Sequence, residues 1–510
     1  MHKFQILFTP IWWPIGCLLG YFFLRDSGYA GEHAFAISVP ATIFCFLIFE
    51  WVRGGGIVRL IYARKEAHRH LDGPYLVEPD AWLGKLKNAV KSIATPPEKL
   101  PSISIGGIEV PRDVEPLHFG LVGGPGNGKS QTVKSMMQVA YARKDRQIVV
   151  DPNGESLKHF WYPGCVILNP FDARGSPWNI FDELTHVMHF LQVSTYVIGE
   201  GEGGEKEWNR FAIQLIAAVC KRLEETGDTT TERLLYNLTI AGPKELGQLL
   251  QGEPITQLLD KGSDKMFSCI RSLLALTLNT WTYLDSAGQF SMREWVKNGQ
   301  GTVFITYGDS QWTFVSQMVR TWVRIAFSQA MDLPEDESKR LWFFLDEISS
   351  LGHLPDLEHA LARTRKHGVS IVLGMQSVAQ LRAIYGRDGA ACIMDCVGNW
   401  LVLATSDPDT CEYMSRLLGE EKIDVKQITE TGGREKSVSK TWKVEYQRVV
   451  QPSTIRNLKR RDGFLSLKGE AKVHRVIVPV VNLPVVAKGY EEKTSLRLKP
   501  RKPKPLPDPS

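Results

Sequence analysis

The sequence has few cysteines, and they form no recognisable motif. Its eight cysteines among 510 residues are scattered, and none belongs to a CxxC pair. Cys392 and Cys396 lie four positions apart, on one face of a predicted helix, but no histidine stands nearby at a spacing typical of a zinc site. We therefore expect all eight thiols to be reduced and non-catalytic, which fits a cytosolic main body.

The sequence also lacks a strong excess of charge of either sign. Sixty-one Lys and Arg residues face 56 Asp and Glu residues, which leaves a net charge of +5. This value permits a nucleic-acid partner but does not by itself indicate one. The composition is that of a folded protein, and the length predicts about three or four domains.

Two long apolar runs open the chain, at residues 4–24 and 34–52. Each is close to the ~20 residues that a helix needs to cross a bilayer. The first run has no small-x-small cleavage site and is followed at once by the second, so a secretory signal peptide is disfavoured. We expect residues 1–65 to form a two-helix transmembrane anchor.

The basic residues predict the orientation of this anchor. The loop at residues 25–33 has one arginine, whereas the residues after the second run are rich in Arg and Lys. By the positive-inside rule both termini and the main body are cytoplasmic. Residues 66–100 are then a basic linker between the membrane and the main body, whose charges rest against anionic lipid headgroups.

A glycine-rich motif follows the apolar run Phe119–Val122, and a helical pattern comes after it. The spacing is that of a P-loop, whose backbone amides and helix start bind phosphate. Lys129 is predicted to reach the β- and γ-phosphates of ATP, and the Ser130 hydroxyl to bind Mg²⁺. The predicted nucleotide-binding residues are Gly123, Gly124, Pro125, Gly126, Asn127, Gly128, Lys129, Ser130 and Gln131.

The body alternates short apolar runs with helical patterns, which indicates an α/β fold with a buried parallel sheet. In such a sheet the nucleotide lies beyond the carboxyl ends of the strands. The predicted strands are 119–122, 147–150, 165–168, 302–306, 341–345, 370–374 and 399–404.

The interval from about 182 to 296 has helical patterns and no convincing strand. It is too long for a simple crossover, so we expect an all-α domain inserted into a nucleotide-binding domain formed by residues 101–181 and 297–487. Its charges are mixed, so a DNA-binding surface here is possible but is not indicated by charge. The basic, proline-rich tail 488–510 is predicted to be disordered.

A second motif reads LWFFLDE, at residues 341–347. An apolar strand followed by two carboxylates, downstream of a P-loop, is typical of an ATPase. Asp346 is predicted to hold Mg²⁺, and Glu347 to orient and deprotonate the attacking water.

Three further positions are less specific. Gln376 ends a predicted strand, where its amide would sense the γ-phosphate, unless it is a surface residue. Asp151 ends another strand and either faces the site or caps a turn. Before the strand of Gln376 lie Arg363, Arg365 and Lys366. They belong either to a solvated basic helix or to a segment that supplies an arginine, with Arg365 preferred, acting in trans on a neighbour's γ-phosphate.

Taken in order, these features resemble the type IV secretion coupling proteins of conjugative plasmids, of the TrwB/TraD type. The resemblance covers nearly the whole chain except the tail and rests on the two apolar runs and on the motifs GGPGNGKS, IVVDPNGE, SPWNIFDEL, LWFFLDE and GMQS. It implies a bacterial inner-membrane ATPase with a RecA-like P-loop domain and an inserted all-α domain.

The resemblance further implies a homo-hexamer with a central channel that binds DNA without sequence preference, receives the relaxase–DNA complex and contacts the inner-membrane components of a type IV secretion channel. It assigns the P-loop roles to Lys129 and Ser130, the second-motif roles to Asp346 and Glu347, and the sensor role to Gln376. Two arginines, Arg363 and Arg365, occupy the neighbourhood of the family's trans-acting arginine.

Two alternatives remain open from the sequence. The protein would be a membrane-bound docking receptor for secreted proteins if ATP served mainly for assembly. A chromosome-segregation pump of the related RecA-like translocases would be expected to have more membrane spans and a C-terminal winged helix, and the sequence shows neither.

Overall fold

The computed structural model describes residues 68–78, 101–201, 203–260, 262–284, 288–431 and 437–496. The two predicted membrane spans and the end of the tail, residues 497–510, lie outside this part of the chain. Among the described helices, none combines the length and the apolar character of a membrane span. The chain divides into a smaller unit, Met1–Gly73 with Glu420–Gln447, and a larger unit, Pro74–Gly419 with Arg448–Ser510.

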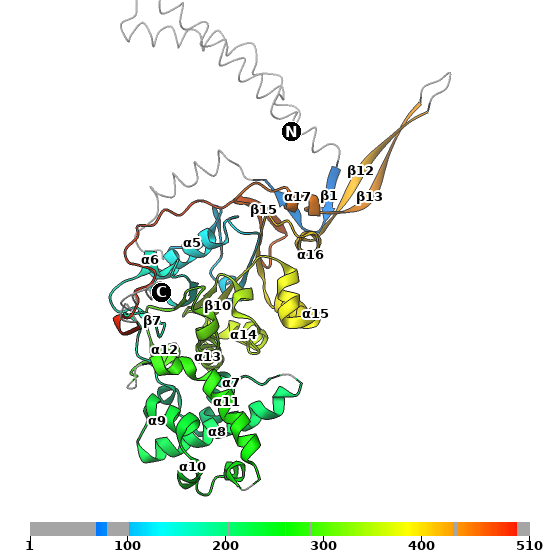
Figure 1. The fold of residues 1–510 in the computed structure, drawn as a ribbon. Coiled ribbons are helices and arrows are strands. Elements are labelled where there is room, and N and C mark those ends of the chain that lie inside the picture. Colours follow the sequence, from blue (N-terminus) through cyan, green and yellow to red (C-terminus); the bar gives the residue numbers. More distant parts are fainter. Residues whose placement is uncertain are drawn as a thin grey trace, which may run out of the picture. The chain divides into compact units, whose positions relative to one another are not determined.

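The larger unit contains a ten-stranded sheet in its described part (Figure 1). Seven neighbouring strands run parallel, and they include all seven that the sequence predicts. Two antiparallel strands and a short edge strand extend the sheet on one side. In spatial order the strands are β2 (Tyr75–Val77), β15 (Lys472–Ile477), β14 (Asp462–Ser466), β11 (Asn399–Leu403), β5 (Phe119–Val122), β10 (Val369–Met375), β9 (Leu341–Leu345), β6 (Arg146–Pro152), β8 (Thr302–Tyr307) and β7 (Val166–Leu168).

The central strands are buried on both faces, which explains their continuous apolar sequences. Every residue of β8, β9 and β10 is buried. In β9, Trp342 and Phe344 enter one hydrophobic cluster, together with α5 (Lys129–Ala142), while Phe343 enters another on the opposite face. Because side chains alternate across a strand, a strand packed on both faces needs apolar residues at successive positions.

The long interval between β7 and β8 contains helices and, among its described residues, no strand. Figure 1 shows these helices gathered at one end of the larger unit. They share one continuous hydrophobic cluster with the sheet and with α13 (Trp312–Met331). The main helices are α7 (Val187–Ile198), α8 (Glu205–Thr226), α9 (Thr231–Leu235), α10 (Pro243–Leu249), α11 (Asp264–Thr277) and α12 (Met292–Asn298).

One buried carboxylate joins the entry and the exit of this helical segment. Glu183 accepts hydrogen bonds from the indole of Trp178 at 2.8 Å and from the backbone N–H groups of Met292 at 2.6 Å and Arg293 at 3.0 Å. The amides belong to the first turn of α12, where a negative charge is favoured by the helix dipole. Burial raises the pKa of Glu183, while these donors oppose the rise. The Glu183 carboxylate therefore holds the start and the end of the helical segment next to each other.

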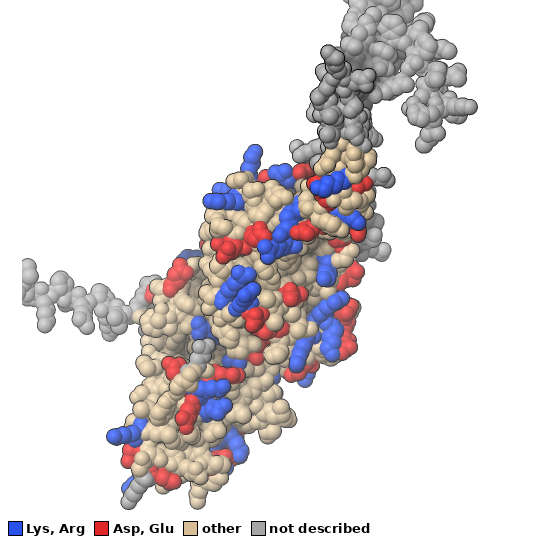
Figure 2. All heavy atoms as spheres, turned by 90° about the vertical axis from the view of Figure 1, so that its right-hand side faces the viewer, with Lys and Arg blue, Asp and Glu red and all other residues tan. Residues whose placement is uncertain are grey.

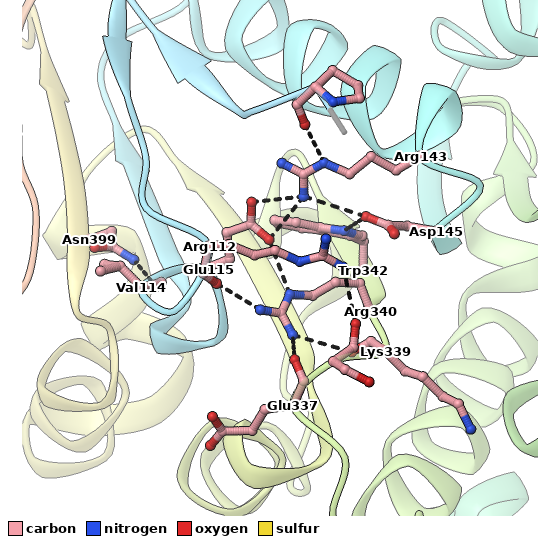
Figure 3. Close-up of polar contacts among 12 residues, drawn as sticks. Arg112, Val114, Glu115, Arg143, Asp145, Glu337, Lys339, Arg340, Trp342 and Asn399 are labelled. Atoms are coloured by element: carbon pink, nitrogen blue, oxygen red, sulfur yellow. Dashed lines mark hydrogen bonds and ion pairs between the residues drawn. The ribbon is translucent and has the colours of Figure 1, made fainter. Parts of the chain in front are cut away.

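A buried ion cluster fixes the segment before β5 against the amino ends of the strands (Figure 3). Glu115 is 0% exposed and lies between two guanidinium groups, of Arg143 at 2.8 Å and Arg340 at 3.1 Å. Arg143 also donates to the carbonyl of Pro101 at 2.6 Å, and Arg340 to that of Arg112 at 2.7 Å. The cluster thus joins the segment 101–117, the end of α5 and the start of β9.

A buried histidine, His118, makes the stability of this region dependent on pH. Its Nε2–H donates to the carbonyl of Leu361 at 2.8 Å, and its Nδ1 accepts from the N–H of Ile371 at 3.1 Å. Burial, with a smaller effect from Arg365, lowers the pKa of His118 to about 4 against 6.5 in the unfolded chain, although the Leu361 hydrogen bond opposes the shift. The unfolded chain therefore binds a proton first as the pH falls.

We expect the free energy of unfolding to lose about 3 kcal/mol from this group between about pH 6.5 and pH 4, and the contribution to be complete above pH 6.5. Urea unfolding at intervals across this range measures the slope. The variant His118→Asn, which cannot titrate, should show a shallower slope than the wild type. Equal slopes in the two proteins would contradict the assignment.

The smaller unit has a three-stranded sheet that the sequence analysis did not predict. Its strands are β1 (His68–Asp72), β12 (Glu420–Thr431) and β13 (Ser437–Arg448), in the order β1-β12-β13. Trp442, Val444 and Tyr446 alternate along β13 and are exposed. Ammonium groups from β12 lie near the two aromatic rings, Lys426 near Trp442 at 5.8 Å and Lys422 near Tyr446 at 6.0 Å.

The segment after β15 crosses the carboxyl edge of the sheet. Its residues 488–496 are ordered, so the prediction that the chain is disordered from residue 488 was wrong for them. Through residue 496 it bonds to the body. The carbonyl of Lys488 accepts from Arg174 at 2.8 Å, Tyr490 donates its hydroxyl proton to the carbonyl of Phe171 at 3.2 Å, and the N–H of Lys493 donates to that same carbonyl at 3.1 Å. Backbone pairing with the body, which composition does not reveal, holds these residues.

Candidate nucleotide-binding site

The P-loop lies between β5 and α5, where two glycines adopt backbone conformations that other residues rarely take. Gly126 has φ of 73° and Gly128 has φ of 116°, and Gly128 is the N-cap of α5. The N–H groups of the first turn of α5 therefore point into a cavity of about 320 Å³. The cavity is lined by Gly126, Gly128, Lys129, Ser130, Gln131, Arg460, Arg461 and Val480.

Lys129 lies at the base of this cavity and is 8% exposed. Its ammonium donates to the carbonyls of Gly123 at 2.6 Å and Gly124 at 3.4 Å. Burial lowers the pKa of Lys129, and the carboxylates of Glu347 and Asp346 oppose that shift. A cation held at this point lies within the loop that would hold phosphate.

Ser130 and Asp346 meet in space although 216 positions separate them. The Ser130 hydroxyl donates to Oδ2 of Asp346 at 2.7 Å, and Oδ1 of Asp346 is buried without a hydrogen-bond partner in the described part of the chain. Burial raises the pKa of Asp346. A hydroxyl and a carboxylate with a free buried oxygen fit Mg²⁺, which favours oxygen ligands and typically takes only one or two carboxylates from the protein.

Glu347 and Gln376 form the next part of the site. Nε2 of Gln376 donates to Oε2 of Glu347 at 2.9 Å, and the Ser349 hydroxyl donates to the other carboxylate oxygen. This contact requires β10 to pass close to the end of β9. A Cβ at Gly374 would lie 1.8 Å from the carbonyl oxygen of Asp346, so only glycine fits there.

The structure thus brings five predicted residues, Lys129, Ser130, Asp346, Glu347 and Gln376, to the carboxyl edge of the sheet. The remaining P-loop residues, Gly123, Gly124, Pro125, Gly126, Asn127, Gly128 and Gln131, form the loop itself and the start of α5. Within the loop region, the side-chain amide of Asn127 donates to the carbonyl of Ala404 at 2.8 Å, and the side-chain oxygen Oε1 of Gln131 accepts from the N–H of Val481 at 2.8 Å.

For Asp151, the structure favours the turn-capping alternative. Its carboxylate is buried and accepts from the N–H groups of Ser156 at 2.9 Å and Leu157 at 2.7 Å, at the start of α6 (Leu157–Phe160). Burial raises the pKa of Asp151 to about 7, although these two donors oppose the rise.

Arg365 lies at the opposite edge of the sheet. It follows α14 (Leu357–Arg363) and precedes the first residue of β10, and its charge acts on His118 at the amino end of β5. Arg363, Arg365 and Lys366 are exposed. Since the P-loop is at the carboxyl ends of these parallel strands, Arg365 is not part of the nucleotide site of its own chain.

Two cavity residues, Arg460 and Arg461, are absent from the sequence predictions. Nε of Arg460 donates to the carbonyl of Gly126 at 3.0 Å, and the carbonyl of Arg461, which has φ of 70°, accepts from the N–H of Val478 at 2.8 Å. The adjacent pair of arginines just before the strand-like GFLSLK was the available signal, but no spacing rule connects it with a P-loop more than 300 positions earlier.

Comparison with known families decides what kind of protein carries this site. The family model described as "Type IV secretion-system coupling protein DNA-binding domain" matches residues 102–479. The chain belongs to this family. Coupling protein TraD of Escherichia coli K12 is 26% identical over 398 residues, which cover 76% of this chain and 56% of TraD. Conjugal transfer protein TraG of Rhizobium radiobacter is 30% identical over 68% of this chain and 59% of its own length.

Solved structures of the coupling protein TrwB share the fold of this coupling protein. TrwB in complex with the non-hydrolysable ATP analogue ADPNP is 30% identical, with a TM-score of 0.71, over 84% of this chain and 98% of that one. TrwB in complex with ADP and Mg²⁺ is 29% identical, with a TM-score of 0.70. The similarity supports the predicted RecA-like α/β fold. The chain spans little more than half the length of the curated TraD and TraG relatives named above.

Proposed function

We propose that this coupling protein is a Mg²⁺-dependent ATPase that moves DNA through a type IV secretion channel during conjugation. The observation that carries the proposal is the arrangement of these side chains at the P-loop cavity. Lys129 and Ser130 line the cavity, and Asp346 accepts the hydrogen bond of the Ser130 hydroxyl. Glu347, which accepts a hydrogen bond from Gln376, acts electrostatically on Lys129. These are the parts that phosphoryl transfer to water requires: a phosphate cradle, metal ligands, a base and a group that orients the water. TrwB in complex with ADPNP, and with ADP and Mg²⁺, supports the same ligands here.

Each side chain then has a distinct task. The P-loop amides and Lys129 bind the phosphates, and Ser130 with Asp346 would hold Mg²⁺, which neutralises charge on the phosphates when bound. Glu347 accepts the proton of the attacking water. The Gln376 amide, already hydrogen-bonded to Glu347, fixes the orientation of that carboxylate and changes partner when the γ-phosphate leaves.

The location and the assembly of the protein are part of the proposal. We place the two apolar runs in the bacterial inner membrane, with the body in the cytoplasm, against the inner-membrane components of the secretion channel. The exposed Arg365, far from its own P-loop, suits a ring hexamer in which it reaches a neighbour's γ-phosphate. DNA binding is supported by the description of the matching family model, and a role in conjugation by the relatives named as conjugal transfer proteins. That the DNA is bound without sequence preference, and that the relaxase is delivered with it, are parts of the proposal itself.

The deciding experiment measures ATP hydrolysis by the full chain in lipid nanodiscs, with and without single- or double-stranded DNA. We expect DNA to stimulate hydrolysis, and the rate per chain to rise with protein concentration as neighbours complete each site. Lys129→Ala should abolish hydrolysis, since the ammonium that binds the phosphates is lost. Lys265→Ala, an exposed lysine on α11, is the matched control and should behave as the wild type.

If the rate of ATP hydrolysis were the same with and without every DNA tested, this result would contradict the DNA motor. It would favour the docking receptor for secreted proteins. The absence of hydrolysis in the wild type, with ATP bound, would leave ATP a role in assembly alone.

A further inference from the structure

A groove outside the ATP cavity lies along α15 (Val378–Cys396), the helix that begins two residues after Gln376. The Ser377 side chain caps this helix by accepting from the N–H of Gln380 at 3.2 Å. The N–H of Val378 donates to the hydroxyl of Thr410 at 2.9 Å, which ties the start of α15 to α16 (Pro408–Leu418). The first turn of α15 is therefore connected both to the ATP site and to the neighbouring helix.

The middle of α15 is interrupted at a glycine. Gly386 has φ of 71° and ψ of 180°, values outside the helical region, and a Cβ there would meet no atom within 4 Å. Arg382 lies before the interruption and Arg387 after it, and both are exposed. The helix is therefore kinked between two arginines that are both exposed.

Between α15 and α16 these arginines line a groove of about 490 Å³. Arg416 of α16 contributes a third guanidinium, and the guanidinium of Arg382 lies 5.7 Å from the centre of the Tyr413 ring. Asp395 is the one carboxylate in the described lining. Figure 2 shows the side of the molecule on which α15 lies in Figure 1, where Lys and Arg side chains stand among acidic ones.

The charges of the groove are only partly neutralised within the chain. Arg416 pairs with Glu412 at 2.8 Å. In the described part of the chain, Arg382 and Arg387 have no ion pair with a carboxylate. Exposed guanidinium groups without such partners, placed beside an aromatic ring, match a chain of phosphates whose bases can stack on a ring.

We infer that the groove between α15 and α16 binds the phosphate backbone of DNA through Arg382 and Arg387. The inference rests on the proposed function and names the surface that the DNA contacts. DNA fits better than an acidic protein, because the groove combines arginines with a ring at its wall and belongs to the region matched by a DNA-binding family model. DNA bound in this groove would also affect the ATP site. A shift of the first turn of α15 would move the nearby Gln376 and so change its contact with Glu347.

The test compares the double variant Arg382→Gln/Arg387→Gln with the wild type as full chains in nanodiscs. Binding of a fluorescent 30-nucleotide DNA, single- or double-stranded, is measured over a range of salt concentrations. Each lost duplex phosphate contact should reduce the slope of log K against log salt by about 0.9, so we expect a decrease approaching about two and an affinity at least tenfold lower near 100 mM salt. The fold stimulation of ATP hydrolysis by DNA should fall with it.

Two control variants make the result specific. Lys206→Gln/Arg210→Gln removes two exposed charges from α8 and should retain the wild-type affinity and slope. Arg382→Lys/Arg387→Lys retains both charges and should keep most of the slope, which a folding defect at these positions would not allow.

The outcomes separate this inference from the proposed function. A wild type that binds no DNA would overturn the DNA motor and the groove together. A wild type that binds DNA, with the glutamine double variant unchanged in affinity and slope, would overturn the groove alone. Mass photometry measures the assembly of each variant. If the glutamine double variant lost DNA binding only to the extent that it lost assembly, the groove would instead be an interface between copies of the chain.

Discussion

Replacing Glu347 with glutamine is expected to slow ATP hydrolysis by about 10²- to 10⁴-fold while ATP still binds, because a general base contributes rate enhancement of that order. The substitution keeps the size of the side chain and one acceptor oxygen, which can serve the Gln376 donor, while the new amide N–H can donate to the Ser349 hydroxyl. It removes the group that accepts the proton from water. Since Lys129, Ser130 and Asp346 are unchanged, the phosphates and Mg²⁺ keep their ligands.

Phosphate release measures the rate, and binding of a fluorescent ATP analogue measures the affinity. Glu207→Gln, an exposed glutamate on α8, is the matched control and should hydrolyse ATP at the wild-type rate. A Glu347→Gln variant with nearly normal hydrolysis would exclude Glu347 as the base. A variant that has lost ATP binding in proportion to its rate would place Glu347 among the binding groups instead.

The part of the site that sequence predicts well depends on local patterns. The P-loop spacing and the carboxylates after LWFFL each lie within about ten residues, and parallel strands bring such segments to one edge. The seven parallel strands were predictable for a similar reason: a strand buried on both faces must be apolar at successive positions, as β9 is.

What sequence did not predict depends on contacts between distant segments. Arg460 reaches the carbonyl of Gly126 across more than 300 positions, and nothing in either segment indicates the other. The sheet of the smaller unit has mainly polar strands, with no apolar run to mark it. For residues 488–496 composition was misleading, because backbone hydrogen bonds to the body, and not apolar side chains, hold them in place.

The trans role of Arg365 is a different case, because it concerns the assembly and not the single chain. The structure places this arginine at the amino edge of the sheet, near His118 and away from its own P-loop. An arginine there contributes to hydrolysis only if a neighbouring chain brings its own P-loop to it. The proposal for Arg365 therefore depends on the ring that we propose and on no contact within one chain.

Replacing Glu115 is expected to have the largest effect on stability. Its two partners, Arg143 and Arg340, have side chains only 2% exposed, and both pair with this one fully buried carboxylate (Figure 3). Removing Glu115 leaves the Arg340 guanidinium without its carboxylate in a poorly solvated place, while Arg143 retains only the more distant Asp145, at 3.7 Å. Breaking a buried ion pair in this way costs about 3–5 kcal/mol. We expect Glu115→Ala to lower the free energy of unfolding by an amount in this range.

Urea unfolding followed by circular dichroism measures the change. Glu115→Gln keeps the volume and one acceptor oxygen, so it should lose less than alanine but remain clearly less stable than the wild type. Glu335→Ala breaks an ion pair with Lys366 whose side chains are 66% and 57% exposed, and it should not change the unfolding midpoint measurably. If all three variants unfolded at the same urea concentration, burial would not be the source of the effect.

The position of the cluster separates its structural role from the chemistry of the ATP site. Glu115 precedes β5 and Arg340 precedes β9, so both lie at the amino ends of strands whose carboxyl ends carry the P-loop and Asp346. At temperatures well below unfolding, Glu115→Gln should therefore bind the ATP analogue as tightly as the wild type. Weaker ATP binding by a variant that is still fully folded would mean that the amino edge transmits its distortion along the strands, and that the two edges of this sheet do not act independently.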